Sequence, residues 1–178
     1  KVTARDIERP AEWSFRNHVI PVLTKTGCNM GACHGAAAGK NGFKLTLRGY
    51  DPAADYLVLT REAIGRRVTP QDPGRSLLLL KPTLLVAHAG GRRFGLESRE
   101  YQVISQWIAE GTKPPSETDR RVDGIRIEPE LVKLRPGTRQ QVVVTAMFND
   151  GYTEDVTQWV RFESTNAGTG SVDDRGLV

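Results

Sequence analysis

The chain has 178 residues, of which 38% are hydrophobic and 26% are charged, and its formal net charge is +4. This length allows one large domain or two small ones. The hydrophobic fraction excludes a disordered chain, and two cysteines exclude a disulfide-rich scaffold and a four-cysteine zinc site. The longest apolar run, Leu77 to Leu80, is far too short for a membrane span. No signal-peptide pattern opens the sequence, so we expect that any such segment has been removed.

The charge is unevenly distributed along the chain. Residues 1–120 carry 18 basic and 12 acidic groups, a net charge of +6, whereas residues 121–178 carry 7 and 9, a net charge of −2. The basic residues are scattered and few aromatic residues lie between them, which argues against nucleic-acid binding. An acidic protein partner or a bound anionic group accounts for this charge equally well.

The first part of the chain is predicted to be mainly helical. Apolar residues at helical spacing from Trp13 to Leu23 predict a first helix that leads toward Cys28. Strict alternation over Phe43–Arg48 predicts a short strand. These two elements flank a loop that carries both cysteines of the chain.

Three further signals follow before residue 112. Asp72–Arg75 predicts a turn, and Ser76 predicts the start of a short helix that continues through Lys81. A longer helix is predicted from Ser98, a suitable N-cap, to the closing Gly111, because apolar residues recur on one face between them.

The composition changes near residue 112, and residues 113–120, with Pro114 and Pro115, predict a linker. Beyond the linker, the pattern predicts only β structure, with turns at Pro136-Gly137 and Asn149–Gly151. The strand candidates are Ile125–Ile127, Gln141–Phe148 and Trp159–Phe162. Short strands at this spacing predict a sandwich, which normally needs about 100 residues. Because residues 121–178 are too few, and the strand-turn-strand pattern of Val172–Val178 stops midway, we expect a chain that is cut inside its second domain.

One motif dominates the chemistry of the sequence, namely Cys28-Asn-Met-Gly-Ala-Cys33-His34. A Cys-x-x-Cys-His pattern indicates covalent attachment of c-type haem, in which two thiols bond the vinyl groups and the adjacent imidazole binds the iron. Here four residues separate the cysteines instead of two, so the loop must bulge between them. Gly31 and Ala32 are small enough to allow this bulge.

Two other interpretations of the motif remain open at this point. Cys28 and Cys33 could form a local disulfide in an exported protein. Alternatively, they could bind zinc together with His34 and a fourth ligand such as His88.

A second axial ligand is expected on the opposite face of the haem. His88 is the best candidate, because glycines in Val86–Gly91 let that loop approach a flat macrocycle closely. His18, on the first helix, is a weaker candidate. Met30 lies inside the attachment loop, and Met147 has the alternation of a strand residue that packs in a core.

Several sequence stretches together carry a resemblance. They are Gly27–Gly35, Gly39–Pro52, Gly65–Val68, Ser76–Lys81, His88–Gly91 and Ser98–Gly111. On these stretches, residues 12–112 resemble the planctomycete-type cytochrome c domain. The resemblance implies a mainly α c-type cytochrome fold with an inserted β-hairpin-like segment near residues 42–70, over a domain that we place at residues 1–112.

The same resemblance implies roles for individual residues. Cys28 and Cys33 are the expected thioether sites, His34 the proximal iron ligand and His88 the distal one. Ala89 stands where a third glycine is common in the family. The haem propionates need cationic or amide partners, for which charge alone nominates five residues: Lys40, Arg66, Arg67, Arg92 and Arg93.

Residues 121–178 resemble the group 2 bacterial immunoglobulin-like domain. The stretches that carry this resemblance are Leu134–Gly137, Phe148–Gly151, Glu154–Thr157, Phe162–Asn166 and Val172–Val178. It implies a partial all-β sandwich, truncated at its C-terminus, that serves as a spacer or adhesion module. The expected fold class is therefore α+β with two domains.

The expected function is one-electron transfer by a single covalently bound haem c with His34 and His88 as axial ligands. The alternatives are a haem-based gas or redox sensor, or a carbohydrate- or protein-interaction module with a structural haem. No nucleophile, carboxylate pair or phosphate loop indicates an enzyme, although the full-length protein could be one. We expect a redox protein partner, further domains of a larger polypeptide, no nucleic acid and no membrane span. Because c-type haem is attached outside the cytoplasm, a periplasmic or extracellular location is expected.

Overall fold

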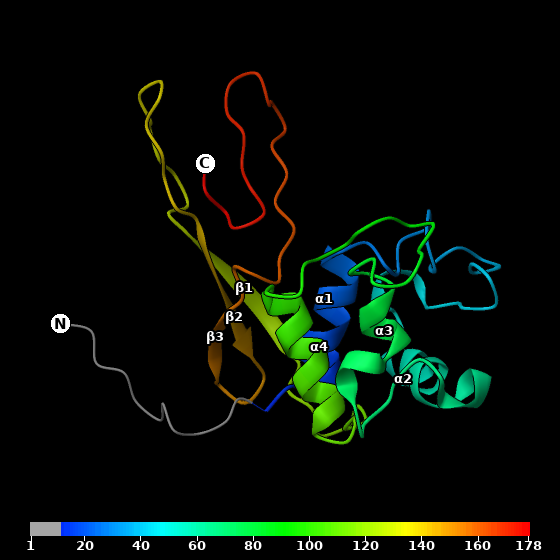
Figure 1. Cartoon of the computed structure of the whole chain (residues 1–178). Coiled ribbons are helices and arrows are strands. Elements are labelled where there is room, and N and C mark those ends of the chain that lie inside the picture. Colours follow the sequence, from blue (N-terminus) through cyan, green and yellow to red (C-terminus); the bar gives the residue numbers. More distant parts are fainter. Residues whose placement is uncertain (1–11) are drawn as a thin grey trace. The chain divides into compact units, whose positions relative to one another are not determined.

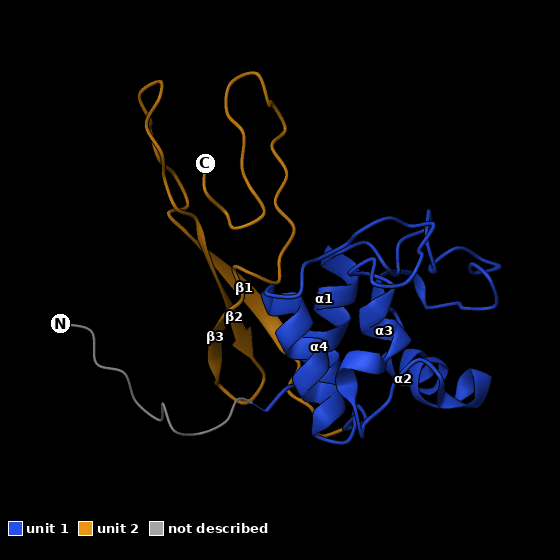
Figure 2. Cartoon of the chain, viewed as in Figure 1, with its two compact units in different colours: residues 1–116 blue, residues 117–178 orange. Residues whose placement is uncertain are grey.

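The computed structural model describes residues 12–178, and the chain forms two compact units, residues 1–116 and 117–178 (Figures 1 and 2). The first unit contains the α-helices and the second a small antiparallel sheet. The α+β class is therefore confirmed. The boundary between the units falls inside the predicted linker, residues 113–120.

The predicted first helical segment, which leads toward Cys28, is confirmed. A π-helical turn, Phe15–Val19, continues directly into α1, Ile20–Lys25. The Ser14 hydroxyl caps the start by accepting a hydrogen bond from the Asn17 amide. Gly27, at φ +81°, stops the helix in a backbone conformation that favours glycine and turns the chain toward Cys28.

The predicted helix at residues 98–111 is confirmed as α4, Arg99–Ala109, and the Ser98 hydroxyl caps it. Its buried face presents Trp107, whose ring lies 5.1 Å from that of Phe15, centroid to centroid. Tyr56, on α2 (Pro52–Thr60), adds an edge-on contact with Phe15 at 5.6 Å. These aromatic contacts join the π-helical turn, α2 and α4 in one core.

The predicted strand at Phe43–Arg48 is wrong. Leu45 is buried, but the Thr46 amide bonds the Asp55 carboxylate instead of a neighbouring strand, and Leu47–Gly49 is a 3₁₀ turn. The alternation reflects burial of one side chain and not a ladder. The implied hairpin-like segment near residues 42–70 is likewise replaced by α2 and turns, apart from a single bridge between Lys40 and Phe43.

The remaining predictions for this unit hold with one change. Pro73–Arg75 forms a 3₁₀ turn, as expected for Asp72–Arg75, and α3, Leu77–Leu80, follows it. Ser76 precedes α3, but its hydroxyl accepts a hydrogen bond from the Thr69 amide and does not cap the helix. The Ser76 hydroxyl, which the local sequence predicted as a helix cap, is therefore used in a tertiary hydrogen bond with Thr69 instead.

The second unit contains an antiparallel sheet in the order β1-β2-β3. Its strands are β1 (Val122–Glu128), β2 (Val143–Phe148) and β3 (Thr153–Asp155). The predicted turn at Asn149–Gly151 joins β2 to β3, with Gly151 at φ +79°. The predicted strand at Trp159–Phe162 is wrong, because the Trp159 amide closes a turn onto the Val156 carbonyl. Among residues 12–178 this is the single sheet, so the sandwich stays a prediction.

Candidate functional site

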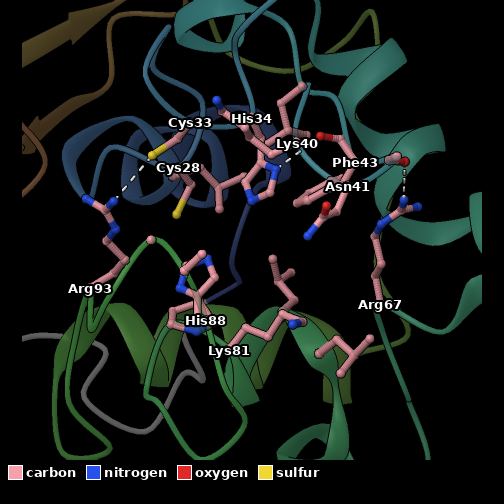
Figure 3. A pocket seen from close by; sticks show the side chains of 18 of the residues that line it. Cys28, Cys33, His34, Lys40, Asn41, Phe43, Arg67, Lys81, His88 and Arg93 are labelled. Atoms are coloured by element: carbon pink, nitrogen blue, oxygen red, sulfur yellow. Dashed lines mark hydrogen bonds between the residues drawn. The ribbon is translucent and has the colours of Figure 1, made fainter. Parts of the chain in front are cut away.

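A cavity of about 820 Å³ lies in the first unit, a volume within the range of cofactor sites (Figure 3). Both cysteines of the attachment motif line it, as do His34 and His88. The other lining residues are Leu23, Ala32, Lys40, Asn41, Gly42, Phe43, Leu45, Ala63, Arg66, Arg67, Leu77, Leu78, Lys81, Pro82, Ala87, Ala89, Gly90 and Arg93. The fold thus gathers the main site residues that the sequence predicts from segments up to 60 positions apart.

The attachment loop is closed by its own backbone. The Cys28 amide bonds the Leu23 carbonyl at 2.8 Å, which ties the loop to α1, and the His34 amide bonds the Cys28 carbonyl at 3.0 Å. The Cys33 amide bonds the Met30 carbonyl at 2.9 Å. These bonds fold the two extra residues of the motif into turns, so that Cys28, Cys33 and His34 all reach the cavity.

The two cysteines are free thiols in different surroundings. Cys28 is buried, and its Sγ lies 3.4 Å from the Thr26 hydroxyl. Burial raises the pKa of the Cys28 thiol, more than the Thr26 contact and the charge of Arg93 lower it. Cys33 is partly exposed, and the Arg93 guanidinium donates a hydrogen bond to its Sγ at 3.3 Å. The two sulfurs are not joined in a disulfide.

The His34 imidazole is held in the state that a metal ligand requires. Its Nδ1 lies 3.0 Å from the Phe43 carbonyl oxygen, and because a carbonyl only accepts, Nδ1 carries the proton and Nε2 keeps its lone pair. Burial lowers the pKa of His34, and the charges of His88, Arg67 and Arg93 add to this effect, while the bond to Phe43 opposes it. The neutral imidazole, which is the metal-binding form, is therefore favoured.

His88 repeats this arrangement on the facing loop. Its Nδ1 donates a hydrogen bond to the Gly91 carbonyl at 2.9 Å, so Nε2 again carries no proton and keeps its lone pair for a metal. Figure 3 shows His34 and His88 reaching the cavity from opposite sides. Their ring centres are 6.4 Å apart and their planes differ by 10°.

The separation of the two rings fits one shared metal atom. A ligating imidazole nitrogen lies about 2.0 Å from its metal and about 1.2 Å from its own ring centre. Two rings on opposite sides of a metal therefore have centres about 6.4 Å apart. Together with the volume of the cavity and the two thiols on its wall, this spacing fits a haem group held between His34 and His88.

The cationic candidates divide into three groups. Lys40, Arg66 and Arg93 line the cavity, whereas Arg92 does not, and its Nε bonds the Phe94 carbonyl at 3.4 Å. Arg67 lines the cavity but is buried and bonded to backbone carbonyls.

Sequence reasoning missed Lys81. This residue lines the cavity and donates from Nζ to the Ala87 carbonyl at 3.0 Å. The signal for it was its place directly after the apolar run Leu77–Leu80, at the end of the predicted short helix.

The weaker ligand candidates lie elsewhere. The Ser14 amide donates to Nδ1 of His18 at 2.9 Å, and the ring of His18 packs edge-on against Trp13. His18, Met30 and Met147 are not among the residues that line the cavity. Within residues 12–178, no three His, Cys, Asp or Glu side chains gather around a common point as metal ligands. Axial haem ligation, unlike a zinc site, uses two protein ligands.

Comparisons with protein-family models, with curated proteins and with solved structures found no match to this chain. The helices in the described part of the chain fall short of the length and apolar character that crossing a bilayer requires.

Proposed function

We propose that the first unit is a mono-haem c-type cytochrome module that transfers single electrons. The observation that carries this proposal is the pair of imidazoles, His34 and His88, whose ring centres are 6.4 Å apart with Nδ1 of each bonded to a carbonyl. Both rings keep Nε2 available across a cavity that also exposes Cys28 and Cys33. When bound, haem supplies a one-electron couple between ferric and ferrous iron.

In the proposed function, the cavity residues would attach the haem, bind its iron and shield it from water. The thiols of Cys28 and Cys33 would attach the haem, each adding across one vinyl group to form a carbon–sulfur bond, with the thiol proton passing to the neighbouring carbon. This addition consumes no oxidant or reductant. His34 and His88 would supply the two protein ligands to the iron, and the apolar wall formed by Leu77 and other residues would exclude water.

Two neutral imidazoles favour ferric iron more than a His/Met pair does, so the reduction potential should be low relative to Met-ligated cytochromes. The same pair would leave no coordination site of the iron open. This arrangement favours electron transfer over gas sensing and over an enzyme that must bind substrate at the metal. A haem with an open position would have favoured those alternatives.

The charge around the cavity supports an anionic cofactor and an acidic redox protein partner. Among the residues that the structure describes, those lining the cavity include no Asp or Glu but several cations: Lys40, Arg66, Arg67, Lys81 and Arg93. Such a surface attracts the propionates and, where the cations remain exposed, an acidic protein. The second unit serves in this proposal as an immunoglobulin-like spacer or adhesion module in a larger exported polypeptide.

The proposal is tested by expressing the chain in the periplasm of a bacterium that has a haem c maturation system. We expect a red protein whose mass exceeds that of the polypeptide by one haem. Its spectrum in alkaline pyridine should report two saturated vinyl groups, and its ferrous form should bind carbon monoxide slowly. A colourless protein of unmodified mass contradicts the proposal, and rapid carbon monoxide binding supports the sensor instead.

A further inference from the structure

Two adjacent arginines, Arg66 and Arg67, line the cavity in different ways. Arg66 is exposed, whereas Arg67 retains 9% of its accessible surface. Burying a guanidinium costs desolvation free energy unless its N–H donors are hydrogen-bonded. The bonding partners of Arg67 therefore indicate its structural role.

Arg67 joins two segments that are far apart in sequence. Its Nη1 donates to the Val58 carbonyl in α2 at 2.7 Å, and its Nη2 donates to the Gly42 carbonyl at 3.1 Å. Its guanidinium also lies 4.6 Å above the centre of the Phe43 ring. The exposed Glu62 carboxylate approaches Nη1 at 3.6 Å.

The segment that Arg67 holds is a tight turn. Lys40 and Phe43 exchange two backbone hydrogen bonds at 2.9 and 3.0 Å, and between them Asn41 and Gly42 have φ of +50° and +69°. Two successive left-handed residues of the Asn-Gly type define a type I′ turn. Arg67 bonds the carbonyl of the second of these residues, and so anchors the turn to α2.

The Phe43 carbonyl, which follows directly, is the acceptor of the His34 Nδ1 proton. The Phe43 ring also packs against His34, with ring centres 4.3 Å apart. We propose that Arg67 is a positioning residue, which holds the turn so that Phe43 fixes the tautomer and plane of the His34 imidazole. This inference rests on the proposed function, because it concerns an axial ligand of that site.

This role separates Arg67 from the propionate partners that its charge suggested. Two of its donor nitrogens are already bonded to backbone carbonyls, and its planar face is stacked on Phe43. A lysine cannot reproduce this combination, because it has a single nitrogen and no planar fork. Arg67 therefore acts on the ligand through the protein backbone and not on the cofactor directly.

The test compares Arg67→Lys and Arg67→Met with Arg61→Met, the matched control that removes the same charge from an exposed position outside the cavity lining. Exchange of the His34 Nδ1 proton with solvent is measured by NMR in the haem-free and the ferrous haem-loaded protein. We expect about tenfold faster exchange in both Arg67 variants, because the supporting bond opens more often. The Nδ1 proton of His88, bonded within its own loop, should be unchanged and serves as the internal reference.

The ferric EPR spectrum supplies a readout that general loss of stability does not move. It responds to the relative orientation of the two imidazole planes, so both Arg67 variants should shift or broaden the low-spin signal, while Arg61→Met should not. Wild-type exchange and EPR in folded Arg67 variants overturn the inference. A wild-type protein without a six-coordinate haem rejects the proposed function instead, so the two failures are distinguishable.

A second variant keeps the test decisive if removal of the buried cation prevents folding. Gly42→Ala keeps Arg67 and places its Cβ where nothing lies within 4 Å, but strains the left-handed backbone of the turn. It should displace the carbonyl that Arg67 holds and accelerate His34 exchange by about threefold, a smaller effect than loss of the guanidinium. Unchanged exchange in Gly42→Ala overturns the inference.

Discussion

The two loops that present His34 and His88 to the cavity are built differently. The His34 loop is bonded at its start to α1, through the Cys28 amide, and at its end to Leu45, whose amide bonds the His34 carbonyl at 2.8 Å. Nδ1 of the His34 ring donates a hydrogen bond to the Phe43 carbonyl, nine residues further along the chain. The His88 ring instead bonds the Gly91 carbonyl, and the Gly91 amide bonds the His88 carbonyl in return.

The His34 ring is therefore bonded to a different segment, whereas the His88 ring is bonded within its own turn of four residues, next to Ala87, whose carbonyl accepts from Lys81. A ligand fixed by several distant contacts loses its geometry only when the fold opens, whereas a ligand on a short local turn can leave its position alone. In the proposed function, this difference would make His34 the more permanent iron ligand and His88 the more easily displaced one. The four predictions below test this difference, from the largest expected effect to the smallest.

Replacing the proximal ligand should have the largest effect. His34→Ala removes both the proposed iron ligand and the ring that packs on Phe43, beside the thiols of Cys28 and Cys33. We expect at least tenfold less haem bound per polypeptide, measured from absorbance and intact mass. Haem content equal to wild type would show that His34 is not the proximal ligand.

Replacing the distal ligand should leave the haem attached. In His88→Ala the two cysteines and His34 remain, so we expect normal haem content, a five-coordinate high-spin spectrum and rapid carbon monoxide binding to the ferrous protein. His18→Ala is the matched control, because His18 does not line the cavity, and its spectrum should equal that of wild type. An unchanged spectrum in His88→Ala would identify another distal ligand.

A methyl group beside the distal ligand should have a smaller effect. A Cβ at Gly90 would lie 2.8 Å from His88 Cε1 and 3.0 Å from Nε2, so Gly90→Ala must displace the ring. We expect a partial high-spin signal and a stability loss of about 1–3 kcal/mol in haem-loaded protein.

The control for Gly90→Ala is Gly31→Ala in the attachment loop, where a Cβ meets nothing within 4 Å. Its spectrum and melting temperature should match those of wild type. Equal spectra for the two alanine variants would mean that the His88 loop moves aside without cost.

The smallest effect concerns pH and the support of the proximal side. Asp55 is buried on α2 and accepts hydrogen bonds from the Thr46 amide and hydroxyl, directly after Leu45. Burial raises the pKa of Asp55 above its ordinary value of 3.8, against the hydrogen bonds from Thr46 that lower it. The folded protein thus holds this proton more tightly than the unfolded chain.

The contribution of Asp55 to stability is therefore present at low pH and is lost as pH rises from 3.8 through the raised folded value. Asp55→Asn keeps an acceptor for Thr46 but does not titrate. The free energy of unfolding of wild type minus that of Asp55→Asn should fall as pH rises through this window. Denaturant titrations at several pH values measure it, and a difference that rises with pH contradicts the sign.

Local signals in the sequence predicted some elements correctly. Ser98 and Gly111 bracket α4, Pro73 lies in its turn, and Asn149–Gly151 joins two strands. These features depend on side chains and backbone preferences within a few residues. Phe43–Arg48 was mispredicted because the Leu45 amide bonds the His34 carbonyl and the Thr46 amide bonds the Asp55 carboxylate on α2, contacts with other segments that a local pattern cannot describe.

The sequence by itself determined the chemical inventory of the site, namely two cysteines beside a histidine and a second histidine among glycines. It also located the change from helical to β pattern near residue 112. Only the tertiary structure decided that His34 and His88 face one another at 6.4 Å, that Lys81 joins the cavity and that Arg67 is committed to backbone carbonyls. The physical reason is that distances between distant segments, and the bonds that a buried charge requires, are fixed by packing of the whole unit.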